Sequence, residues 1–192
     1  MQRKNEVLNL IINFVKAINE GTFKDNNYQI NSPRYLLNQI LRQIQLPESN
    51  YFISERAKQK WLELSKENIK NYYYQKHVLC ENNNPVIVKC FKSNSNNFAK
   101  KELVNGNKFV YKDVFHDEHM IPIDIIIKKL CEFYLSGQLN YNNVEQTINN
   151  IYICKMLKEE DRNIKIKYNR PFELEKVIQN IYLPAGIKIE KL

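Results

Sequence analysis

Residues 109–122 constrain the fold more than any other part of this sequence. They read Phe-Val-Tyr-Lys-Asp-Val-Phe-His-Asp-Glu-His-Met-Ile-Pro, and the first half is rich in the β-branched and aromatic residues that favour a strand. Pro122 ends the strand, because proline has no N–H to give to a neighbouring strand. Groups that transfer protons or bind cations gather at this strand end, namely His116, Asp117, Glu118 and His119. Any chemistry performed by the chain is predicted to occur here.

The N-terminal part of the sequence predicts helices. Residues 4–18 place apolar side chains at the spacing of an amphipathic helix. A second helix is predicted to begin after Ser32, with Pro33 at its first position, and a third after Ser54, because serine caps helix N-termini and proline fits the first turn. Asp124 is expected to cap a further helix, which would end near residue 135.

Beyond the polar stretch at residues 82–85 the pattern changes to short β-rich runs, which alternate with further helical segments. Strands are predicted at residues 86–91, 108–115 and 151–157. We therefore expect an α+β fold, in which a helical region packs beside a small mixed sheet. The helical region would cover residues 1–82 and the α/β region residues 83–192, unless the two form one continuous domain.

The strand predicted at residues 151–157 leads directly into an acidic segment, where Glu160, Asp161 and Asn163 offer oxygen ligands. Hydrolysis of a phosphodiester needs a base to activate water and a divalent cation to stabilise the developing charge. His119 is predicted to be the base, with His116 as the alternative. Glu118 is predicted to bind the metal, and hard oxygen ligands favour Mg²⁺ or Mn²⁺.

The sequence Glu118-His119-Met120-Ile121-Pro122 resembles the acid-His-x-x-Pro signature of the HNH, or ββα-metal, nucleases. This resemblance implies that the acid binds the metal and that the histidine is the general base. Residues 153–162 are similar to the second strand and helix of that motif in a divergent member of the family. Two departures stand out: a helical insertion separates the two strands, and the second-helix histidine is missing.

The net charge of +8 favours a polyanionic partner, because lysine and arginine neutralise phosphates and release counterions. Double-stranded DNA is the expected partner, with RNA and a homodimer left open. No apolar run is long enough for a membrane span, so a cytoplasmic location is expected. The candidate nucleic-acid contacts are one member of the tyrosine cluster at residues 72–74 and the lysines that flank this cluster and the motif strand: Tyr73, Lys70, Lys76, Lys100, Lys101 and Lys112.

These patterns predict a metal-dependent DNA endonuclease, of the kind used in restriction or phage defence. One alternative is a non-catalytic nucleic-acid-binding protein in which the histidines only close a strand end. Another is a protein-interaction or inhibitor protein, in which the tyrosine cluster is the contact surface. Metal-dependent cleavage separates the first hypothesis from the second, and salt-dependent DNA binding separates the second from the third.

Overall fold

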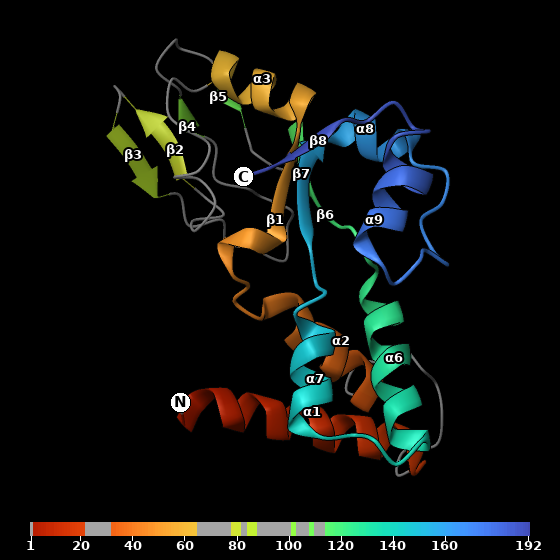
Figure 1. The fold of residues 1–192 in the computed structure, drawn as a ribbon. Helices are drawn as coiled ribbons and strands as arrows, with labels where there is room; N and C mark the ends of the chain where they lie inside the picture. The colour runs from red at the N-terminus through yellow and green to blue at the C-terminus, as the bar shows by residue number, and fades with distance from the viewer. Residues whose placement is uncertain are drawn as a thin grey trace. The chain divides into compact units, whose positions relative to one another are not determined.

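The structure is a computed structural model, which describes residues 2–21, 32–64, 78–81, 84–87, 101–102, 108–109 and 114–192 (Figure 1). The predicted α+β class is confirmed, since helices dominate the N-terminal part and a four-stranded mixed sheet follows. In the part of the chain that the structure describes, no helix combines the length and apolar character needed to cross a membrane.

The chain forms two compact units, and each is assembled from separate stretches of sequence. The helical unit contains residues 1–50, 119–152 and 166–181. The sheet unit contains residues 51–118, 153–165 and 182–192. Both halves expected from the sequence, residues 1–82 and 83–192, therefore contribute to both units.

The sheet unit is built on four strands in the order β6-β7-β1-β8. Strands β1 and β7 are parallel neighbours, whereas β8 runs antiparallel to β1 (Figure 1). Asp117 contacts Lys155, and three residues later the N–H of Met120 donates to the carbonyl of Tyr152, three residues before Lys155. Strand β6 therefore runs antiparallel to β7. The bounds are β1 Tyr51–Ser54, β6 Phe115–His119, β7 Ile153–Leu157 and β8 Ile189–Lys191.

Two helices begin where the central strands end. Helix α3, Glu55–Leu64, follows β1, and helix α8, Lys158–Asn163, follows β7. The predicted cap of α3 is confirmed, because the Ser54 hydroxyl accepts a hydrogen bond from the Ala57 N–H at 3.0 Å. Trp61 is buried on α3 and meets the ring of Phe115 edge to face, with the centroids 5.9 Å apart. Every residue of β7 is buried, and four of its five side chains are apolar, with Lys155 as the exception.

Two further pairs of short strands belong to the sheet unit by sequence. Strand β2, Val78–Glu81, pairs antiparallel with β3, Asn84–Ile87. Strand β4, Lys101–Glu102, pairs in the same way with β5, Lys108–Phe109. The strand expected over residues 108–115 is thus represented by β5 and the first residue of β6, and residues 110–113 lie outside the described part.

The helical unit packs α1, Gln2–Asn19, against α2, Pro33–Gln43, α6, Ile123–Leu135, and α7, Tyr141–Ile148. Its fully buried side chains include Ile11, Leu37, Ile126 and Val144, one from each of these helices. Three short elements complete the described structure: η1, Glu48–Asn50, α9, Leu174–Val177, and the π-helix Ile178–Tyr182.

Helix capping in this unit confirms one prediction and corrects another. Ser32 caps α2, since its hydroxyl accepts from the Tyr35 N–H at 3.2 Å, and Pro33 occupies the first helical position. Asp124, in contrast, is not the cap of α6. The helix begins two residues earlier than expected, at Ile123, with Pro122 at the cap position and no side-chain cap, so Asp124 lies in the first turn. There its charge still favours the positive end of the helix dipole.

Candidate metal centre

The candidate site begins with the alternation of side chains along β6. His116 and Glu118 are two residues apart, so they project from the same face of the strand. The Nε2 atom of His116 lies 3.2 Å from Oε2 of Glu118. The Glu118 side chain is only 14% exposed, whereas the His116 side chain is 42% exposed. The pair therefore combines a largely buried carboxylate with an accessible imidazole.

Asp161 completes the cluster from helix α8. One ligand atom from each of His116, Glu118 and Asp161 lies within 4.8 Å of the others, and all three side chains are partly buried. Among the described residues, this is the one group of three or more histidine, cysteine and acidic side chains close enough to hold a metal ion. Strand β6 supplies two of the candidate ligands, and helix α8, which follows β7, supplies the third.

The carboxylates of this cluster favour a positive charge on or near the His116 imidazole. The hydrogen bond to Glu118 raises the pKa of His116 above its ordinary value of 6.5. Burial acts in the opposite direction, while the charges of Asp161, Glu118 and Asp117 add to the rise. Three carboxylates thus favour a cation at this position, either a proton on the imidazole or a metal ion between the ligands.

The opposite face of β6 carries Phe115, Asp117 and His119. Asp117 forms an ion pair at 3.1 Å with Lys155, whose side chain is only 3% exposed on the neighbouring strand β7. A buried lysine is costly unless a carboxylate compensates its charge, so this pair ties the two strands together behind the cluster. The ion pair of Lys155 with Asp117 was not predicted, because in the sequence Lys155 is only one lysine in an otherwise apolar strand.

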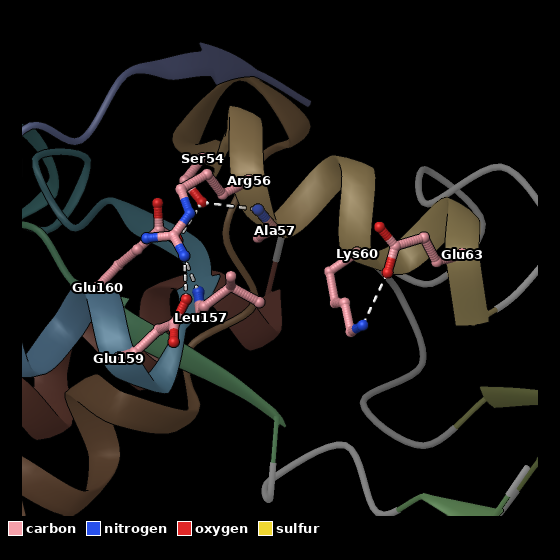
Figure 2. Close-up of polar contacts among 8 residues, drawn as sticks. All are labelled: Ser54, Arg56, Ala57, Lys60, Glu63, Leu157, Glu159 and Glu160. Atoms are coloured by element: carbon pink, nitrogen blue, oxygen red, sulfur yellow. Dashed lines mark hydrogen bonds and ion pairs between the residues drawn. The ribbon is translucent and has the colours of Figure 1, made fainter.

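Glu160 was a predicted metal ligand, but it does not join the cluster. Its carboxylate is buried and accepts hydrogen bonds from the Ser54 hydroxyl at 2.6 Å and from the Leu157 N–H at 2.9 Å (Figure 2). The bond to Leu157 closes the first turn of α8 in the manner of a capping box. Through Ser54, which caps α3, Glu160 also joins the starts of both helices.

The other predicted site residues lie elsewhere or outside the described part. His119 is half-buried at the end of β6, and its backbone carbonyl accepts from Nη1 of Arg170 at 3.3 Å. Asn163 is exposed at the end of α8, and neither residue belongs to the cluster. Lys101 begins β4. The remaining predicted nucleic-acid contacts lie outside the described residues: Lys70, Tyr73, Lys76, Lys100 and Lys112.

The sequence did hold a signal for the grouping that the structure forms. His116 and Glu118 are separated by one residue, as side chains on one strand face must be, whereas Glu118 and His119 alternate. Asp161 and Glu160 could not be told apart from sequence alone, because the choice depends on Ser54, a partner from a distant part of the chain.

No protein-family model, curated protein or solved structure matched this chain. It is an α+β protein whose mixed sheet and adjoining helix bring an imidazole and two carboxylates to metal-ligand distance.

Proposed function

We propose that this protein is a metal-dependent nuclease, and that His116, Glu118 and Asp161 hold its divalent cation. The observation that supports the proposal is the convergence of these three side chains within 4.8 Å of one another. Each is a common metal-ligand type, and together they leave the remaining coordination positions to water and substrate.

The donor set favours manganese among the divalent cations. Carboxylate oxygens suit magnesium, calcium and manganese, whereas an imidazole nitrogen suits transition metals. Mn²⁺ is compatible with both types of ligand, so we propose Mn²⁺ as the preferred ion and Mg²⁺ as a weaker substitute. When bound, the ion would stabilise negative charge on a phosphodiester and its leaving oxygen.

His119 remains our proposed general base, as the HNH resemblance implies. Its side chain is partly buried, and strand alternation places it on the face of β6 opposite His116 and Glu118, so a bend at the strand end would have to turn it toward the metal. His116 belongs to the ligand set in this proposal. The two histidines therefore differ in their expected phenotypes, since loss of His119 should spare metal binding and loss of His116 should not.

The substrate that we propose is DNA, because the chain carries a net charge of +8. A cytoplasmic enzyme of this kind would suit restriction or phage defence, acting as a monomer or a homodimer on duplex DNA. RNA is the second substrate to test, since both polymers present the same phosphodiester chemistry.

The test measures metal binding and cleavage separately. Isothermal titration with Mn²⁺ should show one site in the wild type, and Glu118→Gln or Asp161→Asn should weaken it strongly because each removes an anionic ligand. Supercoiled plasmid and RNA are then incubated with Mn²⁺, Mg²⁺ or chelator. Cleavage that requires the metal and falls about 100- to 10,000-fold in His119→Ala, with metal binding intact, supports the proposal.

Two results would contradict it. If neither Glu118→Gln nor Asp161→Asn changes metal affinity, the cluster is not the metal site. If metal binds but neither polymer is cut, the protein is not a nuclease. Glu160→Gln is the matched control, because it removes a carboxylate from the same helix as Asp161 without touching the cluster.

A non-catalytic nucleic-acid-binding protein is the second candidate, and one observation favours it. The raised pKa of His116 lets a proton supply the positive charge that Glu118 and Asp161 demand. In that case the cluster is a structural ion cluster, which needs no metal. The same titration separates the two candidates, since only the nuclease should bind Mn²⁺ at this site.

A further inference from the structure

A groove of about 570 Å³ lies in the sheet unit, lined by helix α3 and the start of helix α8. None of its lining residues was predicted as a site residue, and none belongs to the metal cluster. The lining consists of Arg56, Gln59, Lys60, Glu63, Val114, Leu157, Lys158, Glu159 and Arg162.

The helical spacing of these residues explains why they line one groove. In α3, positions 56 and 60 are four residues apart, as are positions 59 and 63, so these four residues line one side of the helix. Lys158 and Arg162 share a face of α8 for the same reason, and Glu159 joins them. Leu157 and Val114 add apolar surface at the groove.

The groove carries excess positive charge. Four cationic and two acidic side chains leave its lining with a net charge of +2. Both acids already have cationic partners, as Figure 2 shows: Glu159 pairs with Arg56 across the two helices, and Glu63 pairs with Lys60 at 2.7 Å on α3. Within the described residues, Lys158 and Arg162 form no ion pair, so their charges remain available to an anionic ligand.

We propose that this groove binds the phosphate backbone of a nucleic acid. The inference rests on the proposed function, and it assigns the polymer's docking surface to residues outside the metal cluster. Its volume falls in the range of ligand pockets, roughly 300–1,000 Å³, and so admits more than a single phosphate. Lys158, Asp161 and Arg162 stand at positions i, i+3 and i+4 of α8, so one short helix presents both the groove cations and a cluster carboxylate.

Binding is measured in chelator, where the metal cluster cannot contribute. Fluorescence anisotropy follows a labelled DNA duplex, and an RNA strand in parallel, over a range of salt concentrations. For duplex DNA each phosphate contact contributes about 0.9 to the slope of log K against log salt. The double variant Lys158→Gln/Arg162→Gln should therefore lower the wild-type slope by about 1.8. Glutamine keeps the side-chain stem, and circular dichroism checks the fold.

The matched control is Lys165→Gln/Lys191→Gln, which removes the same charge from exposed positions of the sheet unit outside the groove. Its slope should change by much less than that of the groove variant. Glu63→Gln provides a test of opposite sign, because it removes an acid from the groove lining and should strengthen binding. Equal losses of slope in the groove variant and the control variant, or no gain in Glu63→Gln, would overturn the proposal.

Competition identifies the ligand. Inorganic phosphate and a nucleoside monophosphate should displace the polymer only at concentrations far above that of an unlabelled polymer. If the mononucleotide competes as well as the polymer, the groove is a small-anion site and the backbone proposal fails.

The cleavage assay distinguishes failure here from failure of the proposed function. Metal-dependent cleavage together with an unchanged salt slope in the groove variant would overturn only the groove. A groove-dependent slope without cleavage would support the groove and overturn the nuclease. A wild-type protein that binds neither polymer at low salt would overturn the groove proposal.

Discussion

At the scale of single residues, side chains that are adjacent in this sequence have different structural roles. Glu160 and Asp161 are adjacent carboxylates on α8. Glu160 is buried and accepts a hydrogen bond from Ser54, whereas Asp161 belongs to the metal cluster with His116 and Glu118. The difference follows from the helix geometry, since successive side chains point about 100° apart. Chemical type alone therefore does not identify a ligand, because the partner reached by each side chain decides its function.

The first prediction concerns Glu160. Glu160→Ala should reduce the free energy of unfolding by roughly 2–4 kcal/mol, because it leaves the Ser54 hydroxyl and the Leu157 N–H without their buried acceptor. Chemical denaturation measures this loss. Glu159→Ala is the matched control, since that exposed ion pair with Arg56 should contribute less than about 1 kcal/mol. Similar losses in both variants would contradict the structural role of Glu160.

The second prediction is a pH dependence set by His116. Its folded-state pKa is raised, so in chelator its contribution to stability is complete below about pH 6.5 and is lost as the pH rises through the folded pKa. Denaturation curves of wild type and His116→Gln should therefore converge with rising pH. Stabilisation by Mn²⁺ should show the opposite trend, because the imidazole must lose its proton to bind metal. Metal stabilisation that falls with rising pH would remove His116 from the ligand set.

At the scale of elements, the sequence predicted features that depend on nearby residues but not the pairing of distant strands. Ser32 and Ser54 cap their helices through bonds to residues three positions later, so the sequence predicted both helix starts. The residues from 151 to 157 likewise predicted a strand, and β7 forms within this range. The parallel pairing of β1 with β7 was not predicted, because no local pattern specifies which distant strand becomes the neighbour. Of the candidate site, the segment was predicted but the grouping of His116 with Asp161 was not.

The third prediction concerns the pairing of β6 with β7. Lys155→Met keeps the volume of the buried stem but leaves Asp117 without its cationic partner on the next strand. Breaking a buried ion pair costs about 3–5 kcal/mol, and partial exposure of Asp117 should reduce this to about 2–3 kcal/mol. The double variant Lys155→Met/Asp117→Asn should recover part of the loss in denaturation experiments. A double variant no more stable than the single one would argue against a direct pair.

At the scale of the whole molecule, the chain passes repeatedly between its two units. The helical unit and the sheet unit each combine three separate stretches of sequence. Helices α6 and α7, which lie between β6 and β7 in the sequence, belong to the helical unit, whereas the two strands lie almost wholly in the sheet unit. A boundary drawn at one point of the sequence therefore divides both units.

The fourth prediction tests this arrangement with a fragment of residues 83–192. The fragment lacks β1, which lies between β7 and β8, and it also lacks the Trp61 side chain packed on Phe115. We expect it to show no cooperative unfolding transition by circular dichroism. Addition of residues 1–82 as a separate chain should restore the transition. A fragment that unfolds cooperatively by itself would show that the sheet does not depend on β1.

The position of β1 in the sheet also has a consequence for synthesis on the ribosome. Tyr51 of β1 pairs with Ile153 of β7, and Phe52 of β1 pairs with Lys191 of β8. Both partner strands of β1 are therefore synthesised long after β1 itself. Until those residues emerge, the apolar side chains of Phe52 and Ile53 have no sheet in which to be buried. Strand pairs so distant in sequence form slowly, and their exposed edges invite association with other chains. The nascent chain should therefore depend on chaperones until β8 has been synthesised.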